Sequence, residues 1–414
     1  MRVIVTNTAL LNAGDAAIML GSRRILRRAF GKDVSISVRD QQPEGARQRY
    51  QEFEARPLLY DRIVDWMGPA RARLGVVVLL IATLLQRIGA TPLVRCLLPR
   101  ALHADLIDFA AADLVVSAGG TYLVPHYRFS PKLLELLVAH WLGRPYVLFP
   151  QSLGPFTSRR QRWLVRYVLG NARLIMVRDT KSLHHLRKIG IPDERVLECA
   201  DAAFALQPPG PRGTALPRAP QIAISVRDWP HFGADARTGM TRYMDSVAAL
   251  CTHLVEKHGA ELTFVSTCQG IDAYWTDDSH TAEAVVGRLS KAVREHVTVD
   301  HEFRRPEALV ERLARFDLVV ATRMHVAILA LTASTPVLPI AYEFKTRELF
   351  EKLGFGGLVQ DIADICPDRL CGAADSMLES PGRFRQKAAA GTDALRASAL
   401  DAADSLREAM RVAA

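Results

Sequence analysis

Short, almost wholly apolar runs alternate with longer amphipathic segments along most of the chain. In the first half the apolar runs cover residues 2–6, 34–38, 113–117, 145–149, 173–177 and 196–199. In the second half they cover residues 221–226, 261–266, 296–300, 317–322 and 336–340. Runs without polar alternation are typical of parallel strands that are covered on both faces. The pattern therefore predicts an α/β fold in which parallel strands alternate with helices.

The segments between these runs are predicted to be helical, since their apolar residues recur at helical spacing. In the second half we expect helices at 240–258, 280–294, 324–333 and from 345 onward, and an Ala-rich amphipathic helix over 384–411. Residues 47–103 break the alternation. We interpret them as a helical insertion at the side of the first domain.

A proline-rich segment divides the two alternating halves. Residues 207–221 contain five prolines and two glycines, which exclude a helix or a central strand and predict a linker. We therefore expect two doubly wound, Rossmann-like domains facing a cleft, at 1–206 and 222–383, followed by a C-terminal helix at 384–414. Ligands of such sheets bind beyond the carboxyl ends of the strands.

The composition limits the possible partners. The 414 residues carry a formal net charge of +9, which suits nucleic acid, an anionic membrane or a phosphorylated small molecule. Aromatic residues make up only 7%, and no Lys/Arg tract has aromatics interleaved, so we expect no nucleic-acid binding. Six scattered cysteines without CxxC or His/Cys metal spacing predict reduced thiols and no metal site. The N-terminus lacks the pattern of a signal peptide, so we expect a cytoplasmic protein.

The most apolar stretch, LGVVVLLIATLL at 74–85, has two interpretations. Its 12 residues are fewer than the ~20 that cross a bilayer, which favours a buried helix. Alternatively the segment contacts the inner face of the plasma membrane, assisted by flanking arginines at 71, 73, 87 and 95.

Three turns in the first half follow predicted strands. In NAGDAAI, Gly14 would allow a tight turn, Asn12 or Asp15 could cap the following helix, and Asp15 could instead reach an acceptor hydroxyl. In SAGGTYL, Gly119 and Gly120 would let the backbone approach a ligand closely. The turn FPQSLGPF contains Gln151. Together these residues are candidates for lining a cleft.

Two charged residues, Arg178 and Asp179, end another strand of the first half, and we expect them to form an ion pair that holds the turn.

Cationic residues end three predicted strands of the second half. Arg227 follows 221–226, Arg323 follows 317–322, and Lys345 comes shortly after 336–340. Because parallel strands end at the same edge of a sheet, we expect these cations to form an anion site suited to a phosphate and a carboxylate. His325 lies at the same strand-to-helix junction as Arg323. Taken alone, it is either a core histidine or a catalytic group.

The ordered set NAGDAAI, SAGGTYL, PQSLGPF, VRDTKSLHHLRKIGI, the Asp201 turn, TRMH and the Tyr342–Lys345 segment resembles the polysaccharide pyruvyl transferase family. The resemblance covers some 340 positions. It implies a GT-B-like architecture and transfer of the enolpyruvyl unit of phosphoenolpyruvate onto two sugar hydroxyls. Met324 stands where the family often has leucine, and residues 47–103 do not match the family well.

The resemblance also implies roles for residues. Arg323 and His325 would occupy the family's Arg-x-His positions, and Arg227 its donor-binding position. Phosphoenolpyruvate would be the co-substrate without a further cofactor, bound on the C-terminal side by Arg227, Arg323 and Lys345. His325 would be the general acid. On the N-terminal side Asp15 would orient or deprotonate a saccharide or lipid-linked saccharide acceptor.

Two other functions remain open on the sequence alone. The first is a GT-B glycosyltransferase with a nucleotide-sugar donor, for which Asp361 and Asp364 are the acidic residues that could hold a ribose. The second is a non-catalytic, membrane-associated component of a glycan assembly complex.

Overall fold

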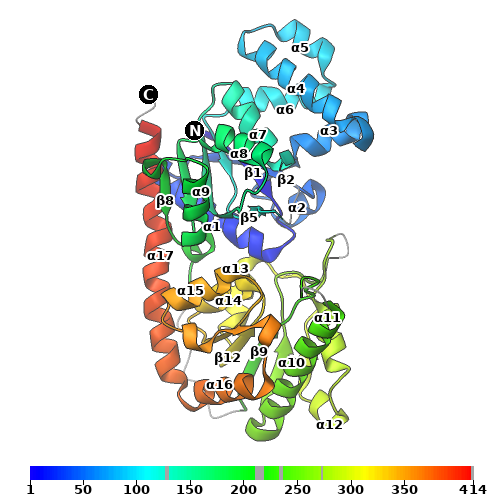
Figure 1. Ribbon diagram of the computed structural model, residues 1–414, viewed down its shortest axis with the longest axis vertical. Coiled ribbons are helices and arrows are strands. Elements are labelled where there is room, and N and C mark those ends of the chain that lie inside the picture. The colour runs from blue at the N-terminus through cyan, green and yellow to red at the C-terminus, as the bar shows by residue number, and fades with distance from the viewer. Residues whose placement is uncertain (126–129, 210–218, 233–235, 272–273, 412–414) are drawn as a thin grey trace. The chain divides into compact units, whose positions relative to one another are not determined.

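The computed structural model describes residues 1–125, 130–209, 219–232, 236–271 and 274–411 (Figure 1). Residues 210–218 of the predicted linker and 412–414 of the predicted C-terminal helix lie outside the described residues. The chain forms two compact units. The first comprises Met1–Leu11, Ile18–Ala205 and Ala397–Ala414, and the second comprises Asn12–Ala17 and Leu206–Arg396.

The first unit contains one parallel sheet. Its strands lie in the order β3-β2-β1-β4-β6-β7-β8, and β5 pairs with β6 outside this path. The strands are β1 (Arg2–Thr8), β2 (Ser35–Asp40), β3 (Glu54–Pro57), β4 (Leu114–Ser117), β5 (Gly120–Leu123), β6 (Tyr146–Leu153), β7 (Leu174–Val177) and β8 (Val196–Glu198). All six apolar runs predicted as strands are confirmed.

The helices of the first unit alternate with its strands, and half of them lie in or next to the insertion. They are α1 (Ala13–Phe30), α2 (Pro43–Arg49), α3 (Leu59–Met67), η1 (Pro69–Arg71), α4 (Ala72–Arg87), α5 (Thr91–Leu97), α6 (Arg100–Ala111), α7 (Ser130–Trp141), α8 (Arg159–Leu169), α9 (Thr180–Lys188), η2 (Asp193–Arg195) and η3 (Ala202–Ala205). The insertion is helical as expected, except for β3.

The second unit contains a parallel sheet with strand order β11-β10-β9-β12-β13-β14. Its strands are β9 (Gln221–Ser225), β10 (Glu261–Phe264), β11 (Val297–Val299), β12 (Leu318–Ala321), β13 (Val337–Ala341) and β14 (Gln360–Asp361). Numbered along this unit, the order is 3-2-1-4-5-6, which is that of Rossmann domains.

The helices of the second unit connect these strands, and the last of them continues into the first unit. They are α10 (Ala236–His258), α11 (Ser279–Val286), α12 (Lys291–Arg294), α13 (Pro306–Leu313), α14 (Met324–Thr332), α15 (Phe344–Lys352), η4 (Gly356–Leu358), η5 (Ile362–Asp364), α16 (Pro367–Glu379) and α17 (Pro381–Arg411). The single helix expected at 280–294 is wrong. It is divided at Gly287, the C-cap of α11, and Ser290 caps α12 by accepting a hydrogen bond from the Val293 backbone N–H.

Each unit has its own hydrophobic core. The first core combines the sheet residues Ile4, Val115 and Leu148 with residues of the helical insertion such as Leu79. The second core is built around Ile222, Val320 and Leu338 of adjacent strands. The two units depart from the domain boundaries expected from the sequence, because Asn12–Ala17 groups with the second unit and Ala397–Ala414 with the first.

Candidate active site

The strand order of the second sheet reverses between the adjacent strands β9 and β12. From β9 the chain continues to β10 and β11 on one side, and from β12 it continues to β13 and β14 on the other. Beyond the carboxyl ends of the strands at such a reversal a doubly wound sheet opens a crevice for ligands. Arg227 lies two residues beyond β9, and Arg323 lies two residues beyond β12. Both therefore occupy the edge of the sheet at which we expected an anion site.

Two of the three predicted donor-binding cations, Arg227 and Lys345, lie over one aromatic ring, that of Tyr342. The guanidinium carbon of Arg227 lies 4.2 Å from the centre of this ring and 5.0 Å from that of Trp229. The ammonium nitrogen of Lys345 lies 5.8 Å from the Tyr342 ring centre. Tyr342 also acts electrostatically on Arg323, whose pKa it helps to raise. A ring between cations positions them through cation–π attraction.

Arg323 is held by a carboxylate that the sequence analysis did not identify. Its Nε donates to Oδ2 of Asp278 at 2.7 Å, and its Nη2 donates to Oδ1 at 2.6 Å. Burial by itself lowers the pKa of Arg323, but Cys268 and Asp278 raise it well above the usual range. The arginine is therefore a fixed cation. The signal for Asp278 was the acidic pair Asp277–Asp278 directly before α11.

Lys345 is also paired. Its ammonium group lies 2.5 Å from Oε2 of Glu343, and only 10% of the lysine side chain is exposed. Both residues are at the start of α15, where the free backbone N–H groups of the first turn favour an anion. The second unit therefore supplies two cation–carboxylate pairs and one stacked arginine instead of three uncompensated cations.

His325 packs against the first turn of α1, which belongs to the same unit. A Cβ atom at Gly14 would lie 2.7 Å from Nδ1 and 2.8 Å from Cβ of His325. Contacts this short are not tolerated, so only glycine fits beside the imidazole. The sequence had suggested a tight turn at this position. The structure instead assigns Gly14 to close packing between the N-terminal turns of α1 and α14.

Asn12 and Asp15 lie at the same turn. Asn12 caps α1, because its Oδ1 accepts from the Gly14 backbone N–H at 2.8 Å, and its Nδ2 lies 3.4 Å from the hydroxyl of Tyr274. Burial raises the pKa of Tyr274, and the nearby carboxylate of Asp15 raises it further. The capping role considered for Asn12 is confirmed, and Asp15 lies near Tyr274 within the second unit.

The thiol of Cys268 lies among these groups. Burial raises the pKa of Cys268 to about 11, Arg323 lowers it, and Asp278 and Asp15 raise it. A thiol with this pKa is protonated at neutral pH and is a poor nucleophile. The close packing of Gly14 on His325 shows that the turn of α1 and the start of α14 meet at one place.

The remaining predicted residues belong to the first unit. Gln151 is fully buried, and its Nε2 donates to the backbone oxygen of Ala118 at 2.7 Å and to the hydroxyl of Tyr122 at 2.8 Å. It does not line an open surface. A Cβ at Gly119 would lie 2.8 Å from Ile18, so this glycine serves packing, whereas Gly120 adopts a positive φ of 131° at the start of β5.

The ion pair expected between Arg178 and Asp179 is wrong. Arg178 instead pairs with Asp201, and its Nε donates to Ser152 at 3.0 Å. Asp179 caps α9 by accepting from the Ser182 backbone N–H at 2.7 Å. Adjacent residues at a strand end point in different directions, so the buried arginine finds its partner across the fold.

One buried acid of the first unit was not recognised. Glu135 on α7 is only 2% exposed, and its Oε1 accepts from the Leu59 backbone N–H at 2.9 Å. Burial raises the pKa of Glu135 to about 7. A single glutamate within the apolar helical run LLELLV was the available signal.

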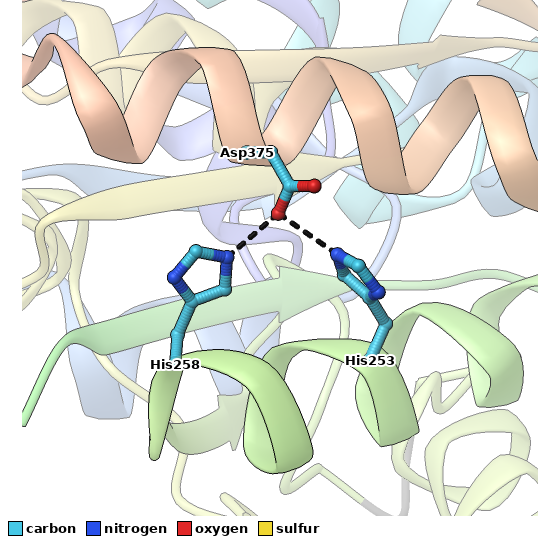
Figure 2. A group of neighbouring side chains, drawn as sticks. All are labelled: His253, His258 and Asp375. Carbon is cyan, nitrogen blue, oxygen red and sulfur yellow. Dashed lines mark hydrogen bonds and ion pairs between the residues drawn. The ribbon is translucent and has the colours of Figure 1, made fainter.

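Among the described residues one group has the spacing of a metal site. His253 and His258 on α10 and Asp375 on α16 offer ligand atoms within 4.8 Å of one another (Figure 2). Both imidazoles hydrogen-bond Oδ1 of Asp375, at 2.8 and 2.6 Å, and the Lys257 ammonium lies 2.7 Å from Oδ2. Because these separations are direct hydrogen bonds, we assign the group to attachment of α16 to the end of α10.

A polar hollow of about 760 Å³ lies in the first unit and is lined by Arg87, Arg144, Arg173 and Arg195 among others. It is located at the amino ends of β6, β7 and β8, next to Tyr146, Leu174 and Val196. Ligands of doubly wound sheets bind at the opposite edge. The hollow is therefore not the site that the strand-end residues form.

Comparison with known sequences finds a family and a relative that match much of the chain. Residues 12–343 match the sequence profile of the family described as polysaccharide pyruvyl transferase. Over 291 residues the chain is 27% identical to the amylovoran biosynthesis protein AmsJ of Erwinia amylovora, which covers 67% of this chain and 68% of that protein.

Solved structures resemble the chain over nearly its whole length. HepE from Anabaena in complex with UDP has a TM-score of 0.59 at 12% identity and covers 100% of both chains. MnaA from S. aureus with UDP has a TM-score of 0.61 at 10% identity and covers 99% of this chain and 97% of its own. The UDP-GlcNAc 2-epimerase from Neisseria meningitidis has a TM-score of 0.57 at 10% identity and covers 99% and 100%. Identities this low establish the fold alone, which is of the predicted GT-B type.

Proposed function

The chain belongs to the polysaccharide pyruvyl transferase family, and from this premise we propose that it forms a pyruvate ketal on a sugar, using phosphoenolpyruvate and releasing phosphate. The observation that carries the proposal is the grouping of Arg227, Arg323, Lys345 and His325 at one edge of the second sheet. Phosphoenolpyruvate has a phosphate and a carboxylate, and this edge combines fixed cations with the N-termini of α14 and α15.

In this proposal the donor is bound by the three cations Arg227, Arg323 and Lys345. Asp278 engages Nε and Nη2 of Arg323 and leaves Nη1 to donate to the donor. Arg227, stacked on Tyr342, is the second ligand of the anionic groups. Lys345 contributes when its ammonium group exchanges Glu343 for the more highly charged phosphate. The existing ion pairs hold the cations in place before the donor arrives, which reduces the cost of ordering them.

The chemistry needs a proton at the methylene carbon of the donor. We assign its delivery to His325, since an imidazolium can donate a proton near neutral pH. Protonation of this carbon turns the methylene into a methyl group and leaves an electron-poor C2. One sugar hydroxyl adds to C2, the C–O bond to phosphate breaks, and the second hydroxyl adds in its place. Of the two hydroxyl protons, one replaces the proton of the acid and the other leaves with phosphate.

The acceptor side rests on the turn of α1. Asp15 is close to Tyr274 and Cys268 and lies on the turn that contacts His325 through Gly14. We assign to Asp15 the orientation of the attacking hydroxyl. AmsJ is named for amylovoran biosynthesis, and by analogy we propose that the acceptor is a saccharide of an exopolysaccharide or its lipid-linked precursor, modified in the cytoplasm.

The test is incubation of the purified protein with phosphoenolpyruvate and a panel of glycosides, followed by phosphate assay and mass spectrometry. We expect phosphate release that requires a glycoside, and a product that has gained one pyruvate less one water. Phosphate release without a ketal product would contradict the proposal. Turnover of a UDP-sugar without phosphoenolpyruvate would assign the chain to the rival glycosyltransferase function.

A further inference from the structure

Exposed large apolar side chains are concentrated in one part of the described chain. Five of them belong to α4 and its C-cap and follow spacings of three and four residues: Leu74, Val77, Ile81, Leu84 and Ile88. Their exposed fractions run from 47% at Leu84 to 76% at Ile88. Such spacing places them along one face of the helix, which we call the α4 stripe. Leu93 and Leu97 of α5 add 56% and 37% exposed side chains.

The packing of α4 in the first unit keeps the stripe on the exposed face of the helix. The opposite face of α4 contributes Ala72, Leu79 and Ala82 to the core of the first unit. At Gly75 a Cβ atom would lie 2.4 Å from the Cγ2 of Ile63, so the backbone of α4 packs directly against this side chain of α3. The helix therefore cannot rotate to bury its stripe without losing this contact.

The segment that carries the stripe has charges of one sign. Residues 66–104 contain no aspartate or glutamate. Within them lie arginines at 71, 73, 87, 95 and 100, and all five are exposed. An apolar face on a segment whose formal charges are all positive matches a surface that is apolar inside and anionic at its rim. A bilayer with anionic head groups has this chemistry.

The geometry distinguishes a helix that lies on a bilayer from one that crosses it. Residues 69–87 are long and apolar enough to cross a membrane by length and composition, and 28% of this stretch is buried inside the protein. However, the 16 residues of α4 span only ~24 Å, whereas the hydrocarbon core is ~30 Å thick. Crossing would also remove Leu79 and Ala82 from the core.

We propose that the α4 stripe, with Leu93 and Leu97, is a membrane-docking surface that binds the anionic face of a bilayer without crossing it. The apolar side chains enter the boundary between head groups and acyl chains, and the arginines at 71, 73, 95 and 100 contact the lipid phosphates. This inference does not depend on the pyruvyl transfer proposed above, because none of these residues belongs to the candidate active site.

The test is flotation with vesicles of phosphatidylcholine and phosphatidylglycerol. We expect the protein to float with these vesicles, to float less with phosphatidylcholine alone, and to be released as NaCl is raised from about 0.1 to about 0.5 M. Ile81→Asp should lower the floated fraction by roughly tenfold or more, because it removes apolar contact and adds a like charge.

Ile107→Asp is the matched control. Ile107 on α6 is 42% exposed, against 49% for Ile81, and the substitution changes the net charge equally. We expect its flotation to stay within about twofold of the unchanged protein. Equal loss in both variants, or no flotation at all, would overturn the proposal. So would a lipid-free dimer that only Ile81→Asp dissociates, since the stripe would then bind a second copy. Phosphate release with a soluble glycoside should be the same in both variants, which separates this test from that of the proposed chemistry.

Discussion

Gly14 has no room for a side chain, since the nearest atoms of His325 would lie 2.7–2.8 Å from its Cβ. We therefore predict that Gly14→Ala displaces His325 and lowers turnover by at least roughly tenfold, with a loss of about 1–3 kcal/mol in the free energy of unfolding. The measurement is ketal formation per folded protein. Wild-type turnover in this variant would show that the position of His325 is not critical.

Gly372 on α16 provides the control for this substitution. Nothing lies within 4 Å of a Cβ built at Gly372, and the residue is in the interior of a helix. Gly372→Ala should therefore raise the free energy of unfolding by up to about 1 kcal/mol through helix propensity and leave turnover unchanged. A loss of turnover in this variant too would show that the loss in Gly14→Ala is not specific to the contact with His325.

His325 and Arg323 are two residues apart, yet we predict different kinetic effects for their replacement. His325→Ala should lower kcat by roughly 10²–10⁴-fold and leave phosphoenolpyruvate binding nearly intact, since it removes proton donation. Arg323→Ala should weaken donor binding by roughly tenfold or more, because it removes a charged ligand and leaves the buried Asp278 without its cation. Calorimetric titration with phosphoenolpyruvate separates the two. If both substitutions weakened phosphoenolpyruvate binding equally, the roles of His325 as general acid and of Arg323 as donor ligand could not be distinguished.

At the residue scale the sequence identified positions better than partners. Arg227, Arg323 and Lys345 were recognisable because charges that follow buried strands must lie at one edge of a parallel sheet. The carboxylates that pair with these cations were not recognisable from the sequence. Asp278, for example, is 45 positions from Arg323 along the chain. The same limit produced the wrong pair at Arg178, whose partner Asp201 is 23 positions away.

Elements were predictable where their apolar pattern is continuous. The runs DLVV at β4 and β12 have no competing interpretation, and both are strands. Two strands of the first sheet escaped detection. β3 has the sequence EARP, which lacks an apolar run, and β5 begins with Gly120 in a segment that resembles a turn. Each is held by pairing with a neighbouring strand, and pairing is a tertiary effect that local pattern does not contain.

The attachment of α16 to α10 makes a prediction about acid stability. Burial by itself raises the pKa of Asp375, but hydrogen bonds from Lys257, His258 and His253 lower it below the usual aspartate range. A carboxylate with a lowered pKa stabilises the fold above its unfolded pKa of about 3.9, and this contribution is lost as the pH falls below that value.

Asp375→Asn should accordingly lower the free energy of unfolding by about 1–2 kcal/mol at neutral pH, and the difference from the unchanged protein should shrink as the pH falls below about 4. Urea unfolding over this pH range is the measurement. Asp393→Asn is the control, because Asp393 is 72% exposed in its pair with Arg396 and should contribute about 0–1 kcal/mol. A difference that does not depend on pH would assign the effect to packing.

At the scale of the whole molecule the chain divides beside its predicted linker, between Ala205 and Leu206, and also at two places that the linker does not indicate. The first turn of α1 belongs to the second unit, and residues 397–411 of α17 belong to the first. The local sequence pattern predicts that α17 is a helix, but it does not predict which unit the end of α17 packs against. The reason lies in contacts with distant residues. Nε and Nη2 of Arg407 donate at 3.0 Å to the backbone oxygens of Ala29 and Arg28, which lie in the last turn of α1.

We therefore predict that the C-terminal segment stabilises the first unit, although it is distant from it in sequence. Leu406 is fully buried, as are Ala399 and Ala403 on the same helix. Leu406→Ala should lower the free energy of unfolding of the first unit by about 2–5 kcal/mol, because it leaves a cavity in this contact. Glu408→Ala, an exposed change two residues away on the same helix, should have little effect. Native-state hydrogen exchange would locate the change: faster exchange in β1, β4 and β6 with unchanged protection of β9 and β12 is the expected result, and the reverse would place the C-terminal segment with the second unit.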